Sequence, residues 1–139
     1  MDKEKFFNAC ERLYNDVVKV SENIGKKQEE GYDINQVMLL STVDDIISEY
    51  NNIIQSVDKD EIPNEFLEVF NAAASVKNNT YYASHHKRLM HDAEATQDDD
   101  ALMTAAQSFI ISRKLLLASY KRALIASKSA LNLRDQKGL

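Results

Sequence analysis

The chain has 139 residues, of which 44% are hydrophobic and 28% charged, so it is long enough for one domain with a real core. It contains only three glycines, one proline and no tryptophan, and this shortage of turn-forming residues excludes a many-stranded β fold. The net charge of −5 stands against a nucleic-acid-binding protein, and a single cysteine, Cys10, excludes an intramolecular disulfide. We expect a soluble cytoplasmic protein without membrane association, because no segment approaches the roughly 20 apolar residues that span a bilayer.

The N-terminal part of the chain predicts two helices. In the first, apolar residues recur at three- or four-residue steps, at Phe6, Cys10, Leu13, Val17, Val20 and Ile24. Gly25 is placed to end that helix, and Gly31 closes the linker after it. Asp33 and Gln36 are typical of a capping box, so we expect the second helix to begin there and to run to about Val57. Cys10 lies within the apolar stripe, where we expect a buried and unreactive thiol.

The middle of the chain predicts two short helices. Pro63 stands where a first helical position tolerates proline, and the third helix then covers residues 66–76. The sequence "KNNT" at 77–80 supplies a stop and a new cap, so a fourth helix is expected over residues 81–94.

The last predicted helix is the longest. Thr96, with Asp99 three residues later, is typical of an N-cap, so this helix is expected to run from Gln97 to Asn132. Residues 133–139 are expected to form a frayed tail. Residues 1–139 are therefore predicted to form a single all-α domain, a bundle of about five mostly antiparallel helices with a long C-terminal helix.

The three histidines, His85, His86 and His91, fall in one segment that ends in three aspartates, residues 98–100. A helical zinc site needs two ligands three or four residues apart, and no two of these histidines have that spacing. We therefore expect no metal site. The aspartates fit the first turn of the last helix, where the helix dipole favours negative charge by about 0.3–1 kcal/mol each. The sequence also has no glycine-rich phosphate loop and no nucleophile beside a base, so we expect no cofactor, no catalytic residue and no enzymatic activity.

The last helix has apolar residues on two sides. One side repeats at sevens, at Ile110, Leu117, Leu124 and Leu131, and is expected to face the core with Arg113 set within it. The other side carries Ile111, Leu115, Ala118 and Ile125. At about 36 residues, or roughly 54 Å, the helix is longer than the expected width of the domain. We expect it to occupy the centre of the bundle; the alternative is that the second side contacts a partner chain.

Positive charge is concentrated in the same helix. Residues 108–139 carry seven basic side chains and one acidic one, so the rest of the chain carries the negative charge. Lys114, Lys121 and Lys128 recur at sevens along the border of the core face. This row either is a solvated flank beside acidic helices of the same fold or contacts a polyanion.

These features favour a non-catalytic interaction protein, such as an adaptor, inhibitor, immunity or assembly factor, which binds a partner protein through helical surfaces. A second copy of the chain is one candidate partner. The alternatives are a nucleic-acid-contacting subunit of a larger complex that uses the basic row, and an enzyme with a site around the three histidines. The residues expected to contact the partner are Ile111, Arg113, Lys114, Leu115, Lys121, Arg122, Ile125 and Lys128.

Overall fold

The computed structural model describes residues 3–24 and 29–137, and within these ranges it contains helices and no strand. The elements are α1 (Lys3–Ile24), α2 (Glu29–Ser56), the short 3₁₀ helix η1 (Lys59–Glu61), α3 (Asn64–Ala95) and α4 (Asp99–Lys137). The all-α class and the long C-terminal helix are thus confirmed. The number of α-helices in the described part is four, so the prediction of about five was slightly wrong.

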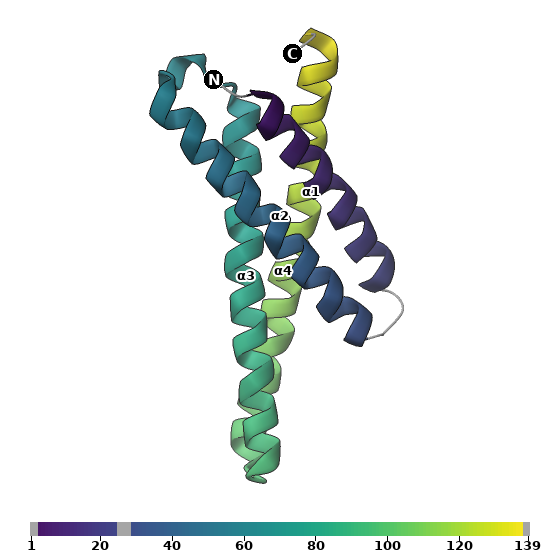
Figure 1. The fold of residues 1–139 in the computed structure, drawn as a ribbon. Helices are drawn as coiled ribbons and strands as arrows, with labels where there is room; N and C mark the ends of the chain where they lie inside the picture. The colour runs from purple at the N-terminus through teal and green to yellow at the C-terminus, as the bar shows by residue number, and fades with distance from the viewer. Residues whose placement is uncertain (1–2, 25–28, 138–139) are drawn as a thin grey trace.

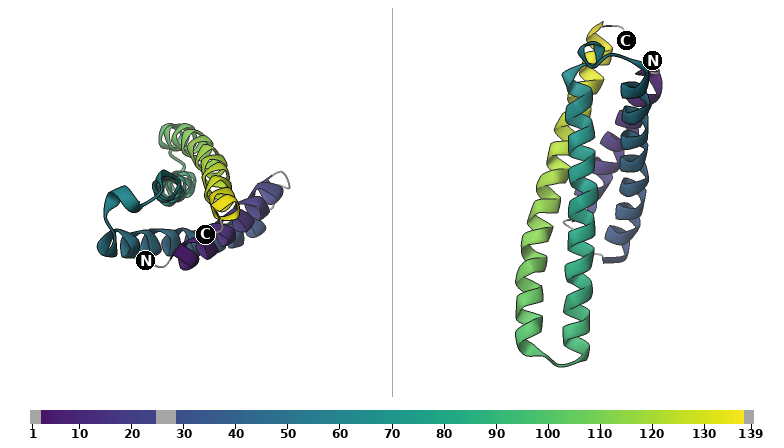
Figure 2. Two further views of the ribbon diagram at one scale, coloured as in Figure 1. Left: turned by 90° about the horizontal axis from the view of Figure 1, so that it is seen from above. Right: turned by 90° about the vertical axis from the view of Figure 1, so that its left-hand side faces the viewer.

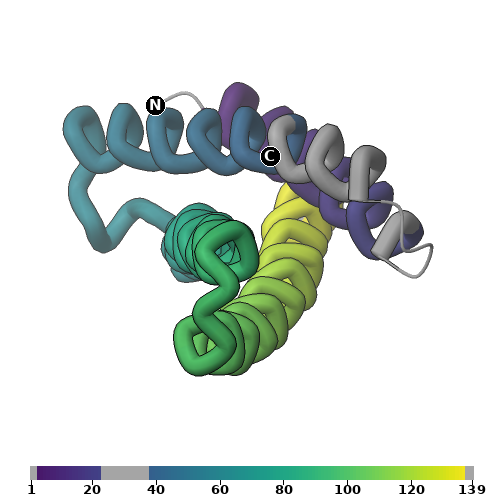
Figure 3. Tube along the Cα trace, turned by 90° about the horizontal axis from the view of Figure 1, so that it is seen from below, coloured from purple at the N-terminus to yellow at the C-terminus, as the bar shows by residue number. Residues whose placement is uncertain are grey.

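The four helices form two antiparallel hairpins of unequal length. Helices α3 and α4 make the long hairpin, and the α1–α2 hairpin crosses one half of it (Figure 1). Helix α1 packs on α2 and α4, and α2 packs on α3. The other half of the long hairpin extends beyond α1 and α2 (Figure 2). We call this extending part, residues 80–115, the distal half, and the part beside α1 and α2 the proximal half. Seen from its turn, the distal half stands clear of the layer that α1 and α2 form (Figure 3).

Helix α3 replaces the two short helices predicted from the sequence. It runs without a break through residues 77–80, where a stop was expected, and has 32 residues. Two contacts explain why local polarity does not end the helix there. The Asn79 side-chain amide donates a hydrogen bond to the carbonyl oxygen of Leu115 at 3.3 Å, and Thr80 is buried against the hairpin partner. Because α4 accepts the hydrogen bond of the Asn79 amide, that side chain no longer competes with the helical backbone.

The start of α2 also differs from the prediction. The helix begins at Glu29, before the expected start at Asp33, so Asp33 and Gln36 lie inside it. Gly25, predicted to end the first helix, lies outside the described residues.

A three-residue turn joins α3 to α4 and caps both helices. Gln97 has a positive φ of 56°. The backbone N–H groups of Gln97 and Asp98 donate to the carbonyl oxygens of Glu94 and Ala93 at 3.2 and 3.0 Å. This pattern is a Schellman motif, which satisfies the last carbonyl groups of α3. The Asp98 carboxylate then accepts the N–H of Ala101 at 3.1 Å and serves as the N-cap of α4, a role predicted for Thr96.

The hydrophobic core lies in the proximal half, where all four helices meet. Phe66 of α3 is fully buried, stacks on Phe6 with ring centroids 4.3 Å apart, and meets Phe7 edge-on at 5.2 Å. The predicted apolar stripe of α1 is buried at each position from Phe6 to Val20. From α4 the core receives Leu116, Tyr120, Ala123, Ala126, Ala130, Leu131 and Leu133.

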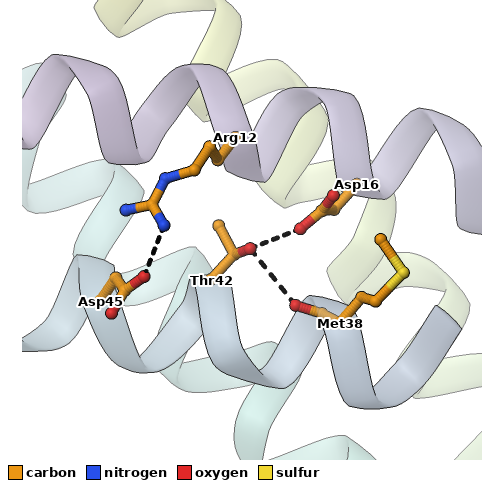
Figure 4. Close-up of polar contacts among 5 residues, drawn as sticks. All are labelled: Arg12, Asp16, Met38, Thr42 and Asp45. Atoms are coloured by element: carbon orange, nitrogen blue, oxygen red, sulfur yellow. Dashed lines mark hydrogen bonds and ion pairs between the residues drawn. The ribbon is translucent and has the colours of Figure 1, made fainter. Parts of the chain in front are cut away.

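Polar contacts between α1 and α2 fix the register of the short hairpin. Arg12 forms an ion pair with Asp45 at 2.9 Å, and the Thr42 hydroxyl donates to the carboxylate of Asp16 (Figure 4). The same hydroxyl lies 3.3 Å from the carbonyl oxygen of Met38. Exposed ion pairs such as Arg12–Asp45 contribute about 0.2–1 kcal/mol each, so they select the register more than they stabilise the fold.

The end of α4 is packed where fraying was expected. The helix continues through residue 137, Leu133 is buried, and Arg134 lies 3.7 Å from Glu11 of α1. Residues 138 and 139 lie outside the described residues.

Candidate protein-interaction surface

The second apolar side of α4 does not lie in the centre of the bundle. Ile111, Leu115 and Ile125 expose 60%, 54% and 59% of their surface, and Ala118 is also exposed. The expected central position was wrong because α1 and α2 cover only the proximal half and only one side of the long hairpin (Figure 2). Ile110, predicted to face the core, is exposed as well, whereas Leu131 of the same repeat is buried.

All eight residues predicted to contact a partner are exposed, but they do not form one face. At about 100° per residue, Ile111, Leu115 and Arg122 lie within about 40° of one another around the helix axis. Arg113 lies on the opposite side, about 160° from Leu115. The structure therefore groups Ile111, Leu115 and Arg122 and separates Arg113 from them.

The three lysines of the basic row, Lys114, Lys121 and Lys128, differ in their contacts within the chain. The Lys128 ammonium lies 5.6 Å from the centre of the Tyr14 ring, so it is held against α1 by a cation–π contact. Arg122 donates to the Ser75 hydroxyl of α3 at 3.3 Å. Lys114 and Lys121 make no hydrogen bond or ion pair with any residue in the described ranges. These two side chains are the part of the row that is available to a partner.

The distal half has small residues inside and large apolar residues outside. Its buried positions are Thr80, Ala83, Ala93, Ala105 and Ser112. Its exposed large apolar residues include Tyr82 and Leu89 on α3, and Met103, Ile110 and Ile111 on α4. Small residues let the two backbones approach closely, but they bury little apolar area. The distal half therefore presents an apolar surface larger than single scattered side chains would give.

A shallow groove of about 250 Å³ lies along this surface, between α3 and α4. Asn79, Tyr82 and His86 line it from α3, and Ser108, Ile111, Ser112 and Leu115 line it from α4. The Nδ1 atom of His86 lies 2.6 Å from the Ser112 hydroxyl, a hydrogen bond that ties the two helices together at the floor of the groove. With most of its exposed wall apolar, the groove suits an apolar side chain of a partner better than a polar ligand.

Sequence reasoning missed Tyr82 as a member of this surface. Tyr82 and Leu89 are seven residues apart and so share one face of α3, as Ile111 and Ala118 do on α4. The seven-residue spacing was visible in the sequence. Because a helix end was expected at residues 77–80, Tyr82 and Leu89 were assigned to a separate short helix and were not recognised as part of a long exposed face.

The histidines are not gathered into one site. His86 bonds to Ser112, while His85 and His91 are exposed on other sides of α3. Among the residues that the structure describes, no three His, Cys, Asp or Glu side chains lie close enough to hold a metal ion.

Cys10 is fully buried in the core. Burial raises the pKa of its thiol to about 12, and the positive charge of Arg134 opposes this shift only in part. The neutral thiol is therefore the stable form in the folded protein, and its low reactivity stays a prediction.

By length and composition alone, α4 could cross a membrane. Within residues 99–136 an 18-residue window reaches a mean hydropathy of 1.2, and 17% of that window is buried. Such a single helix is weak evidence, and the expected absence of membrane association stays a prediction. The low burial agrees with the exposure of Ile110, Ile111 and Leu115 on this helix.

Comparison with family models, with curated proteins and with solved structures finds no match to this chain.

Proposed function

We propose that this chain is a non-catalytic interaction protein that binds a partner protein through the exposed side of α4. One observation carries the proposal: Ile111, Leu115 and Ile125 are each more than half exposed on a single long helix. Monomeric proteins rarely expose several large apolar side chains along one side of a helix, and such surfaces mark interaction sites.

The surroundings of this row support protein as the partner. Lys114 and Lys121 flank it without partners in the described part of the chain, so they can add electrostatic steering to an apolar contact. An apolar centre with a charged rim is the usual composition of a protein–protein interface. A nucleic-acid-binding surface would instead place basic residues at the centre, where this helix has isoleucine and leucine.

The test compares two groups of variants of the full chain, expressed with an affinity tag in the cells that contain it. Ile111→Asp with Ile125→Asp places charge in the apolar row, and Lys114→Glu with Lys121→Glu reverses the free part of the basic row. Lys128 is left unchanged because it contacts Tyr14. We expect both double variants to keep wild-type helicity and melting temperature, because these side chains are exposed.

We expect wild type to retain a specific protein, and both variants to retain less than a tenth of it. The matched controls are Leu67→Asp, at an exposed apolar position of the proximal half, and Lys19→Glu on α1, which should retain it fully. Equal recovery of that protein by wild type and both double variants would contradict the proposal. Recovery of nuclease-sensitive nucleic acid, lost only in the lysine variant, would favour a nucleic-acid-contacting subunit.

A further inference from the structure

One flank of the long hairpin, which covers the distal half and continues on α4 to Arg122, is uncharged along most of its length. On α4 it follows the helical repeat through Thr104, Ser108, Ile111, Leu115 and Ala118. On α3 it contains Asn79, Tyr82, His86 and Leu89, three of which line the groove beside Ile111. Among the described residues of this flank, the first charged side chains on α4 are Asp100 at one end and Arg122 at the other.

We infer that a second copy of this chain covers the flank, with the two α4 helices antiparallel about a two-fold axis at Ile111. The inference rests on the proposed function, since it names the partner of the same surface. A two-fold interface uses the same patch on both copies, so the patch must complement itself. This flank meets that condition in its charge, in its apolar residues and in its size.

The charges of the flank complement each other under this symmetry. Asp100 and Arg122 stand eleven residues before and eleven residues after Ile111. In an antiparallel pair centred on Ile111, Asp100 of each copy therefore faces Arg122 of the other. Lys121 adds a second positive charge beside that contact. Neither Asp100 nor Arg122 has an ion-pair partner within its own chain among the described residues, and Arg122 makes only the exposed contact with Ser75.

The apolar residues of α3 also match under this symmetry. Asn79 bonds to the carbonyl oxygen of Leu115 and His86 bonds to Ser112, so Tyr82, which lies between them on α3, is near the level of residues 112–115 of α4. Leu89 is seven residues further along α3 and so lies near the level of Ser108 on α4. The two-fold axis brings Leu115 of one copy to the level of residue 107 of the other. Tyr82 of one copy thereby meets Leu89 of the other, and an apolar contact forms on each side of the central Ile111 pair.

The size of the flank fits a dimer. From Asp100 to Arg122 the helix is about 33 Å long, and two adjacent helices are roughly 20 Å wide. The resulting strip of about 700 Å² is close to the roughly 800 Å² per partner of a standard protein interface. A bilayer is a poorer occupant, because α3 lies along α4 and exposes Arg88, Asp92 and Glu94 beside this flank.

The first experiment uses charge reversal and sedimentation equilibrium of the purified chain. Wild type is expected to be a dimer at micromolar concentration. Asp100→Arg and Arg122→Asp each place like charges together at both symmetric contacts, and each should weaken the dimer about tenfold or more. Mixing the two single variants restores opposite charges at both contacts, so the mixture should form a heterodimer near wild-type affinity. Carrying both changes in one chain should restore the homodimer in the same way.

The second experiment tests the position of the axis. In a Cys10→Ser background, Ile111→Cys places two thiols beside each other across the axis, and mild oxidation should give a disulfide-linked dimer. Arg113→Cys is the matched control, because it is exposed on the opposite side of the same helix and should remain unlinked. Circular dichroism of each variant shows whether it keeps the wild-type fold.

The outcomes separate this inference from the proposed function. A wild-type chain that stays monomeric at high micromolar concentration refutes the dimer, as does a mixture of charge variants that fails to associate. Binding of the monomer to lipid vesicles, lost in Ile111→Asp, would assign the flank to a membrane. If the chain is monomeric and yet its capture of another protein depends on Ile111 and Ile125, the dimer is refuted and the proposed function stands.

Discussion

Phe66→Ala tests whether α1 is held to the long hairpin mainly by aromatic packing. Phe66 is fully buried and contacts both Phe6 and Phe7 of α1. Removing a buried phenylalanine side chain costs about 3–5 kcal/mol, because the transfer free energy is lost and a cavity remains. Two aromatic pairs, worth about 0.5–1.5 kcal/mol each, are lost as well, so the upper half of this range is expected.

We expect the free energy of unfolding to fall by about 4 kcal/mol. With a urea dependence of about 2 kcal/mol per molar for a domain of this size, the midpoint should shift by about 2 M. Urea unfolding followed by circular dichroism measures this shift, provided that the variant and wild type show the same slope.

Leu67→Ala is the control, since Leu67 is the next residue on α3 and is 43% exposed. It should cost about 1 kcal/mol, because only part of its side chain leaves a non-aqueous environment. A loss below about 1.5 kcal/mol for Phe66→Ala, or an equal loss for both variants, would refute the placement of α1 on the hairpin through Phe66.

Two further predictions concern the core thiol and the helix turn. Because burial raises the pKa of Cys10 to about 12, the folded chain keeps a proton that the unfolded chain loses above about pH 8.5. The free energy of unfolding should therefore decrease between about pH 8.5 and pH 12. Urea unfolding should show that Cys10→Ala removes about 2 kcal/mol of this decrease at pH 10. Equal pH dependence of the variant and wild type would contradict the buried thiol. Gln97→Gly should stabilise the chain by about 0.5–1 kcal/mol, because φ at residue 97 is positive. The control Gln107→Gly, at an exposed position inside α4, should destabilise it by about 1 kcal/mol. Melting temperatures measure both changes, and a loss of stability in Gln97→Gly would contradict the turn geometry.

The sequence predicted the helical class because apolar spacing is a local property. The stripe from Phe6 to Val20 and the length of the last helix were both readable without any tertiary contact. The helix end predicted at residues 77–80 was wrong because it depends on a tertiary contact. Its outcome depends on Asn79 finding the carbonyl oxygen of Leu115, which is 36 residues away. Local propensity cannot include a partner on another helix.

The surface of α4 shows the same limit. The sequence identified two apolar sides, but it could not tell which would be covered, because coverage depends on where the α1–α2 hairpin crosses α3 and α4. It predicted both Arg113 and Ile111 as partner contacts although it had placed them on different sides of the helix, and the structure keeps them on different sides. The pairing of Asp100 with Arg122 about Ile111 follows only once this flank is known to be exposed.

The small residues buried in the distal half have a consequence for motion. Amide protons exchange with solvent when a segment opens locally, and the free energy of that opening follows the apolar area the segment buries. Thr80, Ala83, Ala105 and Ser112 bury little area, while the proximal half is closed by phenylalanine and leucine side chains. Amides around residues 80–115 should therefore exchange through partial openings that leave the proximal half intact. A bound partner would supply the missing apolar area and slow that exchange, so binding would complete the ordering of the distal half.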